Sequence, residues 1–235
     1  IERRMWCQIW NSVKAGYNGI APDSTGRGAA HVRPTNYVKY TIWENAGNDI
    51  RNNEINIKRN YYFGSDVPGY SKGDLIPKSF LTTNDDTMQY VYPNWQKFGT
   101  DKHINGIPGL YFPDFYIVRL PETYLLRAEA YLAKGRTDLA AADINVIRER
   151  AQAPLITAVD ITLDYILDER ARELYGEEFR MLTLSRLGLI YERSKKYGWE
   201  PAKASVQPHN NLMPIPLTAI NRNVGAKLEQ NPGYE

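Results

Sequence analysis

The chain has 235 residues, of which 43% are hydrophobic and 24% are charged. This length and composition are typical of a globular protein with a sizeable core, so a disordered chain is not the default expectation. The 29 basic and 27 acidic side chains are interleaved and give a net charge of +2, whereas nucleic-acid binders cluster their basic residues. We therefore expect no nucleic-acid partner.

The amino-terminal residues indicate a piece of a longer protein. The chain begins without Met, and its first 14 residues, IERRMWCQIWNSVK, already have helical periodicity. Any signal peptide would lie upstream of them. Cys7 is the single cysteine, which excludes an internal disulfide and a thiolate metal cluster. No apolar run approaches the roughly 18 residues that a membrane helix needs.

Residues 15–113 are rich in Gly, Pro, Asn, Asp and aromatic side chains. Short candidate strands such as EINIKRNYYF alternate with turn sequences such as DVPGYSKGD and NGIPG. This pattern predicts long loops that carry small sheets and short helical pieces.

Helical periodicity begins after Tyr116. The segment LPETYLLRAEAYLAKG is predicted to end at Gly135, and TDLAAADINVIRERA follows with Thr137 as its N-cap. One such pair cannot bury its own apolar face, so two further helices, LDYILDERARELYG and EEFRMLTLSRLGLIYERSKK, are predicted to stack on it as one block. The side chains at tetratricopeptide spacing are Tyr124, Ala128, Tyr131, Ala140, Ile144 and Ile147.

Residues 199–235 return to loop and end in NNLMPIPLTAINRNVGAKLEQNPGYE. Its three prolines favour an extended route that needs no pairing partner. We expect this segment to be a structural strap.

The sequence offers no good catalytic centre. GYSKG, around Ser71, matches the pattern of a hydrolase nucleophile elbow, but Pro68 precedes it and no helix of useful length follows. Asp85-Asp86 and Glu177-Glu178 make poor acid/base pairs for glycoside hydrolysis. The charged run over 168–180 is interpreted as a solvated or inter-helix ion network. No metal or cofactor is predicted, because the three histidines, His31, His103 and His209, lie far apart in separate loops.

The aromatic residues of the loop region suggest a binding face. The chain has 17 Tyr against 6 Phe, and Tyr combines a ring with a polar tip. Proteins that bind sugars without cleaving them stack rings on the sugar and use Asn, Asp and Arg as hydrogen-bonding partners. The alternative is that these rings pack in the interior and hold a loop-rich region together. The candidate ligand-binding residues are Tyr17, Asn18, Arg27, Trp43, Tyr61, Tyr62, Asn94 and Trp95.

Three stretches together resemble the carboxy-terminal half of SusD/RagB proteins. They are FYIVRLPETYLLRAEAYLAKGRTDLAAADINVIRERA, ILDERARELYGEEFRMLTLSRLG and LMPIPLTAINRNVGAKLEQNPGYE, and an upstream stretch, HVRPTNYVKYTIWENAGNDIRNN, is similar as well. The resemblance implies a mainly α, SusD-like fold, with a tetratricopeptide-like helical block and a large loop-rich region carrying short strands. The expected regions are 1–115, loop-rich with the ligand face, 116–198, the helical block, and 199–235, a strap packed on the block.

The resemblance also implies a function. Family members are outer-membrane lipoproteins on the cell surface, and they load glycans or peptides into a SusC-like TonB-dependent transporter. We therefore expect a non-enzymatic glycan-binding protein, attached to the membrane through a lipid anchor upstream of residue 1. The alternatives are a peptide-loading member of the family, a carbohydrate-active hydrolase that uses the same rings as subsites, and a purely structural interaction scaffold.

Overall fold

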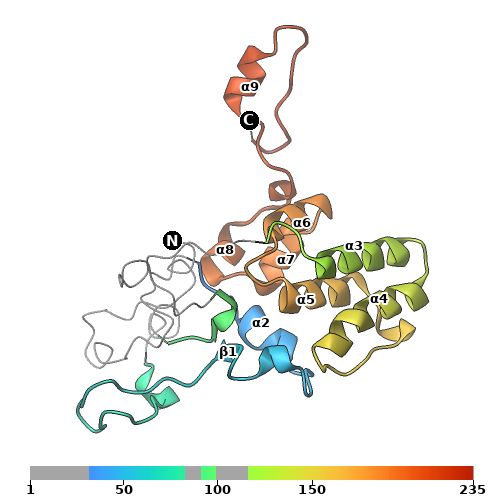
Figure 1. Cartoon of the computed structure of the whole chain (residues 1–235). Helices are drawn as coiled ribbons and strands as arrows, with labels where there is room; N and C mark the ends of the chain where they lie inside the picture. Colours follow the sequence, from blue (N-terminus) through green and yellow to red (C-terminus); the bar gives the residue numbers. More distant parts are fainter. Residues whose placement is uncertain (1–31, 83–90, 99–115, 235) are drawn as a thin grey trace, which may run out of the picture. The chain divides into compact units, whose positions relative to one another are not determined.

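The computed structural model describes residues 32–82, 91–98 and 116–234 (Figure 1). Within these ranges the chain forms eight α-helices and one two-stranded sheet, so the predicted mainly α fold is confirmed. Two compact units divide the chain: the first is Ile1–Pro34 with Val38–Leu174, and the second is Thr35–Tyr37 with Tyr175–Glu235. The division after Leu174 falls inside the region 116–198 that the sequence predicts as one block.

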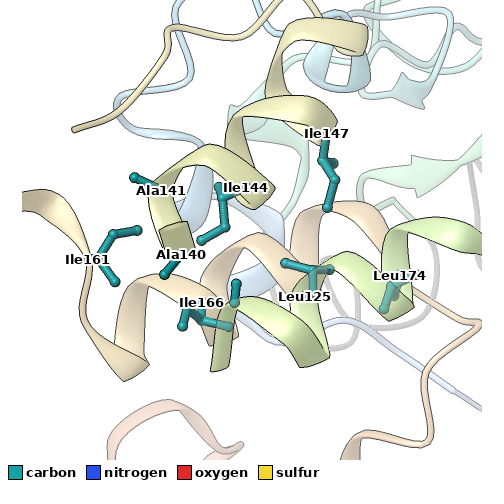
Figure 2. Close-up of a cluster of buried hydrophobic side chains, with 9 residues drawn as sticks. Leu125, Ala140, Ala141, Ile144, Ile147, Ile161, Ile166 and Leu174 are labelled. Atoms are coloured by element: carbon teal, nitrogen blue, oxygen red, sulfur yellow. The ribbon is translucent and has the colours of Figure 1, made fainter. Parts of the chain in front are cut away.

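Three helices pack together in the first unit: α3 (Leu120–Ala133), α4 (Thr137–Arg150) and α5 (Leu163–Glu173). Helices α3 and α4 form a hairpin, and α5 packs against it (Figure 2). Of the side chains predicted at tetratricopeptide spacing, the three that lie on α4 are all buried: Ala140, Ile144 and Ile147. Each buried Leu or Ile contributes about 1.5–3 kcal/mol. The shared core consists of Leu125, Ala128, Ala140, Ala141, Ile144, Ile147, Ile161, Ile166 and Leu174.

The turn between α3 and α4 is partly as predicted. Gly135 has a φ of +69°, the left-handed conformation that ends a helix at low cost in glycine. Thr137 is the first residue of α4 and not its N-cap; Arg136 occupies the cap position, and its guanidinium pairs with Asp138 at 3.0 Å. The prediction of Thr137 as the N-cap is therefore wrong by one residue. Helix α5 does have a side-chain cap, since Thr162 Oγ1 accepts from the Tyr165 backbone N–H at 3.0 Å.

The loop-rich part of the first unit has little regular structure. Strands β1 (Ile57–Lys58) and β2 (Asn94–Trp95) pair antiparallel, with Ile57 opposite Trp95. The predicted strand EINIKRNYYF therefore forms over two residues only. A second buried apolar cluster consists of Tyr61, Phe63, Ile76 and Val91. The remaining short elements that precede α5 in the chain are the helix α2 (Asn36–Lys39) and the 3₁₀ turns Thr41–Trp43, Ile50–Asn52, Lys78–Phe80, Gln96–Phe98 and Ala158–Asp160.

The second unit contains α6 (Arg180–Arg186), α7 (Ile190–Tyr197), α8 (Glu200–Ser205) and α9 (Leu217–Arg222), with a 3₁₀ turn at Pro208–Asn211. The sequence predicts one helix over 177–196, and this prediction is wrong. Gly188 has a φ of +67° and separates α6 from α7. Arg193 holds the amino-terminal piece of the unit, because its Nη2 donates to the Tyr37 hydroxyl at 2.8 Å.

The strap folds back on itself within the second unit (Figure 1). Gln230 exchanges two hydrogen bonds with the Ile215 backbone, at 2.7 and 2.8 Å. The Tyr234 hydroxyl donates to the Leu212 carbonyl oxygen at 2.8 Å and accepts from Asn210 Nδ2 at 3.0 Å. Helix α9 interrupts the extended route, so the strap is partly helical. Its packing on the helical block stays a prediction.

None of the helices in the described ranges is long and apolar enough to cross a membrane.

Candidate ligand-binding site

The predicted ligand residues fall into three groups. Tyr17, Asn18 and Arg27 lie outside the described residues. Tyr61, Tyr62, Asn94 and Trp95 lie on or beside the two-stranded sheet. Trp43 belongs to a 3₁₀ turn, where its indole N–H donates to the Val38 carbonyl oxygen at 2.9 Å. The structure thus gathers four of the eight side chains in one place.

The five candidates that the structure describes differ in burial. Tyr62 is 53% exposed, whereas Trp43, Tyr61, Asn94 and Trp95 are between 2% and 7% exposed. The extended backbone turns successive side chains to opposite sides, so Tyr61 and Phe63 enter the core and Tyr62 points outward. A buried ring cannot stack on a sugar, and Tyr62 is therefore the described ring among the eight candidates that is exposed enough to serve as a platform. The binding role of the eight residues stays a prediction.

Trp95 also forms one wall of a hollow of about 280 Å³, the Trp95 hollow. Its walls come from the loop-rich part, from β2 and from the ends of α4 and α5. Basic side chains dominate them, and Asn56 adds an amide. The lining residues are Ile50, Arg51, Asn56, Trp95, Lys97, Arg119, Arg150, Arg172 and Glu173.

Glu173 organises the basic residues of the Trp95 hollow. Its Oε2 accepts from Arg51 at 3.0 Å and from Arg150 at 2.6 Å, and its Oε1 accepts from Arg119 at 3.2 Å. Its backbone carbonyl oxygen, at the end of α5, accepts from Lys97 Nζ at 2.7 Å and from Arg119 at 3.1 Å. Cations suit this place because a helix C-terminus carries partial negative charge and unpaired carbonyl groups.

One turn earlier on α5, Glu169 is fully buried between three arginines. Its carboxylate oxygens accept from Arg51 at 2.8 Å, Arg148 at 2.9 Å and Arg172 at 2.7 Å. Burial alone would raise the pKa of Glu169, but the three positive charges outweigh it and hold the pKa below its usual range. Glu169 therefore stays ionised and ties the loop residue Arg51 to α4 and α5.

The charged run over 168–180 is therefore an inter-helix ion network, one of the two forms that the sequence predicts. Sequence reasoning missed its burial and its reach into the loop region. A signal exists in Glu169 and Glu173, two like charges four residues apart on one helix face. Such a pair repels in water and is stable only among several cations, which here come from the loop, from the N-cap of α3 and from α4 and α5.

The Trp95 hollow is equipped for binding more than for acid/base chemistry. Glycoside hydrolysis needs two carboxyl groups that face the substrate. Glu173 is the one carboxylate among the described lining residues, and arginines already occupy both its oxygens. The N–H donors of the lining suit ligands rich in acceptor oxygen, such as the hydroxyl groups of a sugar.

The described lining of the Trp95 hollow includes neither Ser71 nor a histidine. Ser71 sits in a turn in which the Asp74 carboxylate accepts from the Ser71 backbone N–H at 2.7 Å, and no helix follows it. His209 contacts Tyr234 edge to face in the second unit, and His31 and His103 fall outside the described residues. Within the described ranges, no group of three or more His, Cys, Asp or Glu side chains could hold a metal ion.

The family model described as SusD family matches residues 7–234. The chain belongs to the SusD/RagB family. A curated relative, the starch-binding protein SusD of Bacteroides thetaiotaomicron, is 34% identical over 146 residues, which are 60% of this chain and 25% of that protein. The chain thus spans about a quarter of the length of this SusD/RagB relative.

Two chains of known structure are also similar to the present chain. One is called BT4246 and aligns with a TM-score of 0.42 at 23% identity, over 64% of this chain and 30% of its own. The other is the selenomethionine form of BT4246, with a TM-score of 0.43 at 23% identity, over 64% of this chain and 31% of its own.

Proposed function

We propose that this chain is the carboxy-terminal portion of a non-enzymatic glycan-binding lipoprotein on the outer-membrane surface, which delivers oligosaccharide to a SusC-like TonB-dependent transporter. The observation that carries the proposal is the family match over residues 7–234, together with a curated relative that is named for starch binding. The lipid anchor would lie upstream of residue 1.

The site supports binding without cleavage. Tyr62 offers an exposed ring beside the sheet, and the Trp95 hollow offers many N–H donors near an aromatic wall. A stacked ring contributes about 0.5–1.5 kcal/mol beyond its buried area, so a few rings give an affinity between millimolar and micromolar. Weak, reversible capture suits a protein that must pass its ligand to a transporter.

Isothermal titration of the chain against a panel of oligosaccharides tests the proposal. We expect at least one glycan to bind, and Tyr62→Ala and Tyr17→Ala to weaken its binding about 2- to 10-fold, the equivalent of one stacked ring. Phe179→Ala is the matched control, because Phe179 is 83% exposed but belongs to the second unit.

Other outcomes would replace the proposal. Indifference to every glycan, combined with tight binding of peptides, would indicate a peptide-loading member of the family. New reducing ends after incubation with polysaccharide would indicate a hydrolase. Delivery is tested separately, with the full-length protein in cells: deleting it should slow uptake of the glycan that binds in vitro.

A further inference from the structure

A second hollow, of about 230 Å³, lies where a loop meets α4 and α5 in the first unit. Arg172 borders both this hollow and the Trp95 hollow. We call it the Tyr165 hollow, after the half-buried ring in its wall. Its lining residues are Thr41, Ile42, Asn45, Ala46, Arg148, Tyr165, Asp168 and Arg172.

The wall of the Tyr165 hollow is fixed in place by the ion network. The guanidinium carbons of Arg148 and Arg172 lie 5.8 and 5.6 Å from the centre of the Tyr165 ring. Both arginines donate to the buried Glu169 carboxylate. Each also donates through Nε to a backbone carbonyl oxygen, Arg148 to Pro154 at 2.6 Å and Arg172 to Ile42 at 2.9 Å. A site held in this way needs no ordering when a ligand enters.

This rigid wall keeps unused hydrogen-bonding groups. The side chains of Arg148 and Arg172 are only 5% and 11% exposed, yet neither Nη2 donates a hydrogen bond to another group in the described residues. The Tyr165 hydroxyl has no hydrogen-bond partner in the part of the chain that the structure describes. Burial raises the pKa of Tyr165, so the hydroxyl keeps its proton. Thr41 and Asn45 are exposed, and their side chains make no hydrogen bond to other described residues.

The positive charges at the Tyr165 hollow are paired within the protein. Arg148 and Arg172 both donate to the Glu169 carboxylate. Arg51, the third partner of Glu169, is paired with Asp49 at 2.7 Å. A charged ligand would disturb these buried pairs, whereas a neutral ligand rich in hydroxyl groups would not.

Size and polarity indicate what such a ligand would be. The volume is below the roughly 300 Å³ at which pockets for drug-sized ligands begin, and it equals about eight waters at roughly 30 Å³ each. Ile42 and Ala46 supply apolar surface for C–H groups. The arginines and Tyr165 supply donors, and the Thr41 hydroxyl and the Asn45 amide can both donate and accept. This mixture matches a compact ring that carries several hydroxyl groups.

We propose that the Tyr165 hollow binds a single neutral sugar ring of a glycan. This inference rests on the proposed glycan-binding function and adds a site and a ligand class to it. The hollow selects the uncharged ring because the hydroxyl groups of the sugar can pair with all the donors and acceptors of the hollow. Its position beside the Trp95 hollow, across Arg172, gives the two sites a common wall.

Saturation-transfer NMR titrations of the chain with glucose, galactose and mannose test the proposal, with glucuronate and glucosamine as charged counterparts. We expect at least one neutral hexose to bind in the millimolar range and more tightly than both charged sugars. Asn45→Ala and Tyr165→Phe should each weaken the affinity for that hexose about 2- to 10-fold, the equivalent of one hydrogen bond. Both substitutions spare the arginines that hold Glu169.

Matched controls separate binding from stability. Asn48→Ala changes an exposed amide three residues from Asn45 that does not line the hollow, and Tyr131→Phe changes a half-buried hydroxyl elsewhere in the helical core. Both should bind as the unchanged chain does, and all four variants should keep its melting temperature to within a few degrees.

Three results would overturn the inference. The first is that no neutral hexose binds although oligosaccharides still do, which leaves the proposed function standing. The second is that a charged sugar binds more tightly than every neutral one, and the third is that Asn45→Ala and Tyr165→Phe both bind normally. If glycans of every length fail to bind, the proposed function and this inference both fall.

Discussion

The buried carboxylate of Glu169 offers the sharpest test of how the loop-rich part is held to the helices. Glu169 is 0% exposed, and the side chains of its partners Arg148, Arg172 and Arg51 are 5%, 11% and 12% exposed. Glu169→Gln keeps the shape but removes the negative charge, and it leaves three buried cations short of a partner. Removing one member of a buried ion pair costs about 3–5 kcal/mol.

We expect the lower end of that range, about 3 kcal/mol, because each arginine keeps another acceptor and the Gln oxygen can still accept one hydrogen bond. Urea unfolding followed by tryptophan fluorescence measures the change, since Trp43 and Trp95 are buried in the same unit. Glu149→Gln, an exposed residue on α4, is the control and should stay within about 0.5 kcal/mol of the unchanged chain. An equally small effect of Glu169→Gln would refute the reasoning.

The same carboxylate predicts a dependence of stability on pH. Because the pKa of Glu169 in the folded chain lies below its ordinary value of 4.5, the folded state binds fewer protons than the unfolded state. Its contribution is fully present above about pH 4.5 and is lost as the pH falls through the lowered folded-state pKa. Urea unfolding between pH 3 and 7 should show this loss in the unchanged chain and a smaller loss in Glu169→Gln. Equal pH profiles for the two proteins would contradict the assignment.

Three further predictions concern the core, a helix end and the strap. Leu125→Ala empties a fully buried position and should lower the free energy of unfolding in urea by about 2–5 kcal/mol. Leu126→Ala, at a 44% exposed position, should lower it by less than about 0.5 kcal/mol. Similar losses for both variants would contradict the assigned core. Gly188→Ala places a Cβ in open space but at a φ of +67°, so backbone strain alone should lower the free energy of unfolding by about 1 kcal/mol, which thermal unfolding measures. Gly225→Ala also places its Cβ in open space, at a position without positive φ, and should be neutral or slightly stabilising. Tyr234→Phe removes the hydroxyl that joins Asn210 to Leu212, so hydrogen exchange at residues 212–217 should speed up while α4 stays unchanged; unaltered exchange in the strap would argue against that closure.

The sequence predicts the helical core well because its signals are local. Ala140, Ile144 and Ile147 recur at helical spacing and are all buried, and Gly135 ends α3 in the left-handed conformation. The break at Gly188 was missed because the apolar pattern continues across it. A glycine inside such a pattern can also lie in an unbroken helix, and periodicity alone does not tell the two apart.

The candidate site was harder to predict because it depends on contacts between distant residues. Arg51 reaches Glu169 and Glu173 across 118 and 122 residues of chain, which no local pattern encodes. The aromatic residues of the loop region were ambiguous for a related reason. The same composition serves a binding face or an interior, and the backbone alternation at Tyr61, Tyr62 and Phe63 decides which rings are buried. Trp43 and Trp95 are among the rings that the fold buries.

Capture without cleavage is the central claim, and one experiment addresses both halves of it. The chain is incubated with the oligosaccharide that binds best in titration, the complex is separated by size, and the bound sugar is released and measured by mass spectrometry. We predict that the oligosaccharide elutes with the protein and is recovered at its original length. Recovery of shortened products, or elution of the whole panel away from the protein, would contradict the account.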